Sequence, residues 1–74
     1  MASELTKKLG QQVKRLRLAK GKTQEAVADA SGLHVTYIAS VESGKRNPSF
    51  LSLVALARGV DVTVDTLVQG LDLE

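Results

Sequence analysis

Apolar residues recur every three or four positions along the chain, which is the spacing that places them on one side of an α-helix. The first such stripe consists of Leu5, Leu9, Val13 and Leu16. It predicts a helix from about 4 to 20, ended by Gly21. No stretch alternates apolar and polar residues in the manner of a β-strand. The pattern therefore predicts an all-α protein.

Four further helices are bounded by residues that typically cap helices. They are expected from Thr23 to near Gly32, from about 34 to Gly44, from Ser49 to Gly59, and from Thr63 to about Val68. Serine and threonine side chains accept hydrogen bonds from free backbone N–H groups at helix starts, and glycine favours helix ends. Asn47-Pro48 predicts a turn, because the residue before proline avoids the helical region. We expect one compact five-helix domain over residues 1–74.

The second and third helices have the spacing of a helix-turn-helix motif over about 23–43. Ala28 is small enough for the third helix to cross close above it, and Gly32 permits a left-handed turn. Leu33, Ile38 and Val41 can hold the third helix on the second.

The outward face of the third helix is predicted to be small and polar. With Ile38 at the centre of the buried side, Thr36, Ser40 and Ser43 fall on the opposite side and Val35 on the shoulder. Such a face can enter the major groove of DNA, where hydroxyls bond base edges and methyl groups contact thymine. The same face also fits a simply solvated helix. Lys45 and Arg46, which follow at once, favour DNA.

Two charges lie on predicted apolar faces. Arg17 continues the stripe of the first helix, and Glu42 lies on the core side of the third. Because unpaired buried charges are costly, we expect Arg17 and Glu42 to form a structural ion pair.

Composition narrows the remaining function classes. The 74 residues include no Cys and one His, so neither a disulfide framework nor a zinc site is expected. Apolar runs are too short for a signal sequence or a membrane span, and we expect a cytoplasmic protein that contacts no membrane. Catalytic constellations and phosphate-binding loops are lacking, so we expect no enzyme, no cofactor and no small-molecule ligand.

Charge divides the chain into two parts. Residues 1–46 contain nine Lys and Arg against four Asp and Glu, whereas residues 47–74 contain one Arg against four acids. A basic half suggests binding to a polyanion, although solvated surface charge would look the same.

The acidic half contains more apolar residues than two short helices need for one inward face. They are Phe50, Leu51, Val54, Leu67, Val68, Leu71 and Leu73. We expect the core to take Leu53, Val54, Leu56 and Leu67. Phe50, Leu51 and Val68 are expected to face a second copy of the chain, in a dimerisation region of about 49–73.

The segments VKRLRLAKGKTQEAVADASGL, YIASVESGKRNPS and VDVTVDTLVQG resemble the lambda-repressor-like, Cro/C1-type helix-turn-helix family. The resemblance implies a five-helix domain that binds operator DNA as a symmetric dimer, with Arg17 and Glu42 as a structural pair. GLHVTYIASVESGKRNPS looks most similar to the controller proteins of restriction–modification systems. These usually carry an arginine before the residues TYI, where this chain has Val35, which would contact a thymine methyl or simply pack.

The resemblance also implies roles for individual residues. Val35, Thr36, Ser40 and Arg46 would read bases, with Arg46 also able to reach a phosphate. Gln24, His34, Tyr37, Ser43, Lys45 and Asn47 would contact the DNA backbone. Tyr37, the only tyrosine, could instead belong partly to the core.

Two other functions fit the same sequence. In an antitoxin, the apolar acidic half would bind a toxin while the basic half represses transcription. In a protein-interaction module, the fold would be kept without DNA binding.

Overall fold

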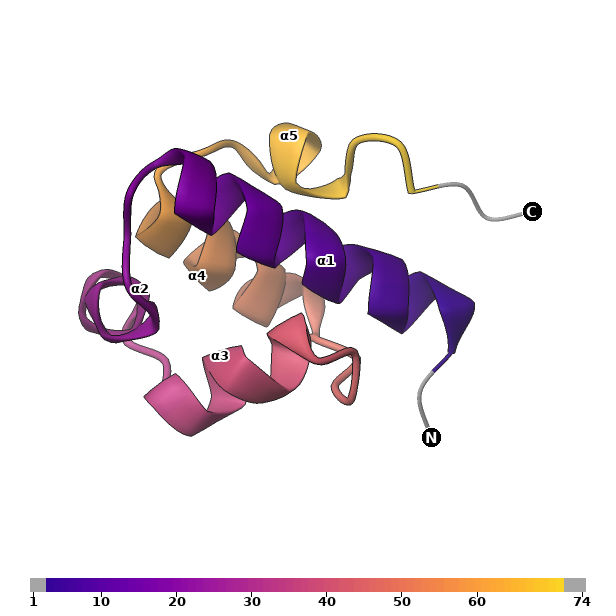
Figure 1. The fold of residues 1–74 in the computed structure, drawn as a ribbon, viewed down its shortest axis with the longest axis horizontal. Helices are drawn as coiled ribbons and strands as arrows, with labels where there is room; N and C mark the ends of the chain where they lie inside the picture. Colours follow the sequence, from indigo (N-terminus) through magenta and orange to yellow (C-terminus); the bar gives the residue numbers. More distant parts are fainter. Residues whose placement is uncertain (1–2, 72–74) are drawn as a thin grey trace.

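The computed structural model describes residues 3–71, and these form five helices without a strand (Figure 1). The helices are α1 (Glu4–Ala19), α2 (Gln24–Ser31), α3 (Val35–Glu42), α4 (Phe50–Val60) and α5 (Val64–Val68). The predicted all-α, five-helix fold is confirmed. Within the described range, no helix is both long and apolar enough to cross a bilayer.

Side-chain caps begin the helices. Thr23, Ser49 and Thr63 each accept a hydrogen bond from the backbone N–H three residues later, at 3.0, 3.1 and 3.1 Å. Ser3 caps α1 in the same way, in a reciprocal capping box with Thr6. These bonds satisfy N–H groups that have no partner inside the helix.

One predicted helix end is wrong. We expected the fourth helix to end at Gly59, but α4 continues to Val60 and Asp61 takes the left-handed conformation, with φ 69°. Gly59 instead lies against α2, where a Cβ atom would come within 2.8 Å of the Val27 carbonyl oxygen. The glycine is required there by a close helix–helix approach.

The core is made by side chains from all five helices. The fully buried ones are Val13, Val27, Ile38, Val41, Leu56, Val60 and Leu67. Burial of each such side chain contributes roughly 1.5–3 kcal/mol to stability. In Figure 1, α1 crosses the molecule, with α4 behind it, α3 along one edge and α5 along the opposite edge.

Gly10 sets how closely α1 and α3 approach. A Cβ atom at this position would overlap the Val41 carbonyl oxygen and lie 2.7 Å from the Glu42 carbonyl oxygen. The C-terminal end of α3 therefore rests directly on the backbone of α1, and the outward face of α3 is fixed relative to the rest of the domain.

Candidate nucleic-acid interface

The α2–turn–α3 unit holds α3 with one side buried and the other free. Gly32 ends α2 with φ 76°, and Leu33 packs partly buried against the core. Ile38 and Val41 on α3 are fully buried. The opposite side of α3 is thereby turned outward at an edge of the molecule (Figure 1).

The outward side carries the predicted small polar residues. Thr36 and Ser43 are exposed, while Val35 and Ser40 are half-buried. The Ser43 hydroxyl donates to the Ser40 carbonyl oxygen at 3.0 Å, at the last turn of the helix. The face is narrow and free of long side chains, which is the shape that close approach to base edges needs.

The loop after α3 is ordered by a two-bond helix cap. The N–H of Gly44 donates to the Val41 carbonyl and the N–H of Lys45 to the Ser40 carbonyl, both at 3.0 Å. This is the Schellman arrangement, with Gly44 left-handed at φ 82°. The exposed residues Lys45, Arg46 and Asn47 follow directly; the Arg46 guanidinium lies over the ring of Tyr37 on α3, and Asn47 lines a hollow with residues of α1 and α4.

His34 has a structural role that the sequence analysis missed. Its Nδ1 atom accepts a hydrogen bond of 3.2 Å from the Thr36 backbone N–H, so His34 caps the start of α3. Histidine is not among the preferred capping residues, so its type alone did not indicate this role. The ring is exposed, and its other nitrogen remains available to a ligand.

Gln24 is tied to the ion-pair carboxylate. Its Nε2 atom donates to Glu42 Oε1 at 3.0 Å, which links the first residue of α2 to the last residue of α3. An amide nitrogen carries two hydrogens, so one N–H of Gln24 is engaged in this bond and the second can donate elsewhere. Half-buried Gln24 therefore combines a structural contact with a free donor.

Arg17 and Glu42 meet in two-point contact between α1 and α3. Arg17 Nε donates to Glu42 Oε2 at 2.6 Å and Nη2 donates to Oε1 at 3.0 Å. Arg17 Nη1 donates to the Lys22 carbonyl at 2.8 Å. The hydrogen bond to Glu42 raises the pKa of Arg17 above its ordinary value, against the opposing effect of burial. Each of the three guanidinium nitrogens thus donates to a group inside the protein.

Tyr37 is half-buried and packs against the core, so one part of its ring is anchored. The guanidinium carbon of Arg46 lies 5.7 Å from the centroid of the same ring. Of the two alternatives left open for Tyr37, the structure shows the partial packing on the core, and contact with the DNA backbone stays a prediction.

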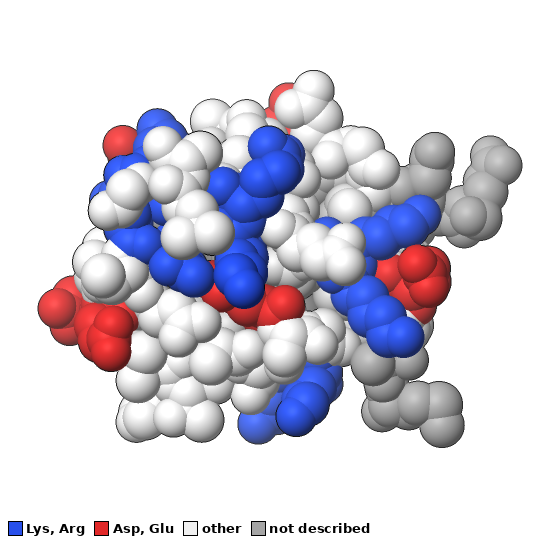
Figure 2. All heavy atoms as spheres, in the orientation of Figure 1, with Lys and Arg blue, Asp and Glu red and all other residues white. Residues whose placement is uncertain are grey.

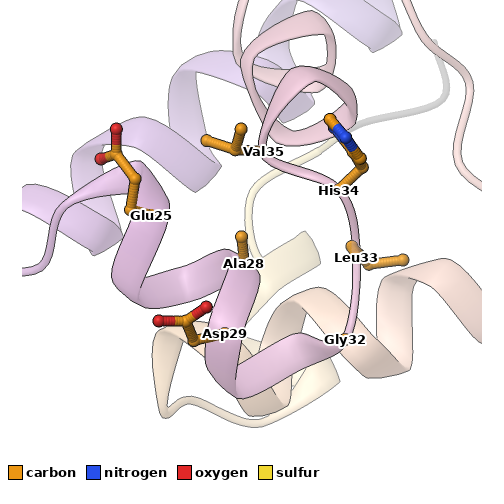
Figure 3. A pocket seen from close by; sticks show the side chains of 7 residues that line it. All are labelled: Glu25, Ala28, Asp29, Gly32, Leu33, His34 and Val35. Atoms are coloured by element: carbon orange, nitrogen blue, oxygen red, sulfur yellow. The ribbon is translucent and has the colours of Figure 1, made fainter.

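A hollow of about 600 Å³ lies between α2 and the start of α3 (Figure 3). Glu25 and Asp29 stand on its α2 side, and His34 and Val35 on its α3 side. Both acids are exposed, and their charge repels phosphates. The hollow is therefore unsuited to the DNA backbone.

Lysine and arginine side chains gather mainly away from this hollow. In the view of Figure 2, Lys and Arg side chains collect over α1, and acidic side chains lie at the left and right edges and near the centre of the face. Lys7, Lys8, Lys14 and Arg15 on α1 are all exposed. The basic half of the sequence is thus distributed over two surfaces, α1 and the loop after α3.

A separate apolar surface lies at α4 and α5. Phe50 and Leu51 are 69% and 76% exposed. Val68 is half-buried and lines a hollow of about 230 Å³ together with Leu5, Thr6, Leu9, Asn47, Leu53 and Leu71.

Val54, which was predicted to be core, is half-buried and is not among the side chains packed on the core. Residues 72 and 73 of the predicted dimerisation region lie outside the described residues.

A family model described as helix-turn-helix matches residues 13–67, from the middle of α1 to the buried Leu67 of α5. The chain belongs to the Cro/C1-type helix-turn-helix family. It is accordingly a DNA-binding transcriptional regulator and not an enzyme.

Curated members of the helix-turn-helix family resemble the chain over most of its length. The HTH-type transcriptional regulator y4dJ of Sinorhizobium fredii is 39% identical over 93% of this chain and 90% of its own length. The control protein C.SmaI of Serratia marcescens is 40% identical over 89% of this chain and 81% of its own length.

Solved helix-turn-helix structures agree with the fold. The restriction–modification controller protein C.AhdI from Aeromonas hydrophila is 40% identical, with a TM-score of 0.80 over 84% of this chain and 94% of that one. The controller protein C.Esp1396I, solved as a tetramer with its natural 35 base-pair operator, is 36% identical, with a TM-score of 0.85 over 93% of this chain and 91% of that one. The chain therefore resembles restriction–modification controller proteins in sequence and in fold.

Proposed function

We propose that this chain is an operator-binding regulator that acts as a homodimer and inserts α3 into the major groove. The observation that carries the proposal is the division of α3: Ile38 and Val41 are buried, while Thr36 on the opposite side is exposed. A helix anchored in this way can present its polar side to base edges without moving.

The proposal assigns base readout to four residues and backbone contact to six. Val35, Thr36, Ser40 and Arg46 contact base edges, and Gln24, His34, Tyr37, Ser43, Lys45 and Asn47 contact the backbone. Support comes from their common location on α3, at the start of α2 and in the loop after α3. Hydroxyl, amide and cationic groups can donate hydrogen bonds to phosphates and to the acceptor atoms of base edges. Ser43 would exchange its bond to the Ser40 carbonyl for one to a phosphate.

The proposed dimer uses the region of about 49–73, with Phe50, Leu51 and Val68 against the second copy. Two large exposed side chains on neighbouring positions of α4, beside an apolar hollow, support an interface that buries them. Two-fold symmetry would set the two α3 helices about 34 Å apart, on two half-sites of a pseudo-palindromic operator.

The resemblance to controller proteins favours a regulator of restriction–modification genes. C.Esp1396I assembles on its operator as a tetramer, and a dimer of the present chain is the corresponding half of such an assembly. Because the proposed regulator binds an operator, we expect it in the cytoplasm, where its DNA lies. In this proposal, regulation depends on protein concentration and operator arrangement.

Selection of binding sites from random-sequence DNA, followed by salt titration, tests this function. We expect two half-sites about one helical turn apart and a logarithmic salt slope of about 0.9 for each phosphate neutralised. Uniform weak binding to all sequences would contradict sequence-specific regulation. Co-purification of a second polypeptide that covers the apolar surface at α4 and α5 would favour the antitoxin alternative.

A further inference from the structure

We infer that Tyr37 is a positioning residue for Arg46, in that its ring face holds the guanidinium beside α3 before DNA is bound. The inference rests on the proposed DNA-binding function and deepens it. It adds the support of another side chain to the backbone contact proposed for Tyr37.

The ring is held on one side. Tyr37 is half-buried and packs against the core side chains, so part of its ring is anchored. A guanidinium centred 5.7 Å from the ring centroid lies within the distance at which cation–π attraction operates. Arginine is suited to this contact because its planar group stacks on aromatic faces.

The backbone brings the two residues together. The Schellman bonds from Gly44 and Lys45 turn the chain back along α3, which sets Arg46 beside the α3 residue Tyr37. Gly44 also packs on α1, where a Cβ atom would lie 3.0 Å from the Lys7 Cα atom, so the loop is held from two sides. The Arg46 backbone thus belongs to a loop held by hydrogen bonds and packing, and its guanidinium lies over the ring of Tyr37.

The consequence is pre-organisation of an otherwise flexible cation. An exposed arginine loses rotamer freedom when it binds, and a contact made in the free protein reduces that loss. Among the described residues, Arg46 is the cation that lies over an aromatic ring, so its exposed neighbour Lys45 serves as the matched comparison. We expect Tyr37 to affect DNA affinity through Arg46 and to leave the contribution of Lys45 unchanged.

A double-mutant cycle tests the coupling, with the best-bound duplex selected by the wild-type chain as probe. Tyr37→Leu should weaken binding by about twofold to fivefold in the wild-type background and by much less in Arg46→Ala. In Lys45→Ala the effect of Tyr37→Leu should be undiminished. Tyr37→Phe keeps the ring and should retain the coupling to Arg46, so any affinity lost with the hydroxyl should be the same in the wild-type and Arg46→Ala backgrounds.

A measurement on the free protein separates this inference from the proposed function. Ring-current shifts of the Arg46 side-chain protons in NMR report on the stack, and the part of the shifts that depends on Tyr37 is separated from any effect of Phe50, the other aromatic residue among Phe, Tyr and Trp, by the Tyr37 variants. These shifts should persist in Tyr37→Phe and vanish in Tyr37→Leu, with thermal stability followed alongside to identify a folding defect.

Additive losses of Tyr37→Leu and Arg46→Ala in the cycle would overturn the inference while operator binding stands. Failure to select any sequence would overturn the proposed function and this inference with it, even if the ring-current shifts are present.

Discussion

Arg17 and Glu42 form a two-point ion pair whose side chains are only 9% and 4% exposed, and it joins the end of α1 to the end of α3. The same carboxylate accepts a bond from Gln24, the first residue of α2. One buried group thus fixes three helices of the helix-turn-helix region relative to one another. Buried pairs of this kind are expensive to desolvate, but removal of one partner is more costly still.

Glu42→Ala should lower the free energy of unfolding by about 3–5 kcal/mol, because Arg17 is left charged and unpaired in a buried place. Chemical denaturation followed by circular dichroism measures the change. Lys20→Ala is the control, since Lys20 pairs with Asp61 only at 3.8 Å on the exposed surface and should change stability by about 0.5 kcal/mol or less. Equal denaturation midpoints for wild-type protein and Glu42→Ala would contradict a stabilising pair.

Gly10→Ala should destabilise the protein, although alanine at an ordinary helix position is favoured by about 1 kcal/mol over glycine. The added methyl group would overlap the backbone of α3, and forcing the helices apart typically costs about 1–3 kcal/mol. Gln11→Ala, at an exposed position of the same helix, is expected to stay within about 0.5 kcal/mol of wild type. A more stable Gly10→Ala protein would show that α1 and α3 can separate freely.

Leu51→Glu should convert the proposed dimer to a folded monomer. Leu51 is 76% exposed, and a carboxylate in the first turn of α4 suits the helix dipole, so the monomer itself loses little stability. Sedimentation velocity measures the assembly. The matched control is Leu18→Glu, at a residue 58% exposed on α1 and away from this surface, which should remain dimeric. A dimer that survives Leu51→Glu would place the interface elsewhere.

Thr36→Ala should change the bases selected at one position of each half-site, with a loss of preference of about fivefold, because a single hydroxyl bond contributes about 1 kcal/mol. Ser40→Ala should act at a different position of the half-site. Repeated selection from random DNA measures both. If neither substitution alters the preferred sequence, the outward face of α3 does not read bases.

Lys45→Ala should weaken all DNA sequences alike, since a phosphate contact carries no base information. The logarithmic salt slope should fall by about 0.9 for each copy of the chain that is bound. Lys8→Ala, at an exposed position on α1, should leave the slope nearly unchanged if α1 lies away from the DNA. An altered sequence preference in Lys45→Ala would instead indicate base contact.

Local patterns were enough to predict the helices. Thr23, Ser49 and Thr63 cap them as expected, because a side-chain cap involves residues only three positions apart. The burial of Ile38 and the exposure of Thr36 likewise follow from their separation on a helix. The charges of Arg17 and Glu42 stood out because each interrupts an apolar stripe.

Apart from the Arg17–Glu42 pair, contacts between elements could not be predicted in this way. Gly59 looked like a helix end, yet it lies inside α4. Glycine is needed there because α2 comes within van der Waals distance of its backbone. The Gln24–Glu42 bond spans 18 positions, and the Tyr37–Arg46 contact depends on where the loop after α3 returns.

By itself, then, the sequence determined the helices, their starts, the buried side of each and the family, since periodicity, capping and motif spacing are properties of short segments. Only the tertiary structure decided how closely α1 rests on α3, which cation meets an aromatic ring, and which apolar side chains of α4 stay outside the core. These features depend on which surfaces meet when the helices pack and on the distances between them. A linear pattern of residues contains no such distances.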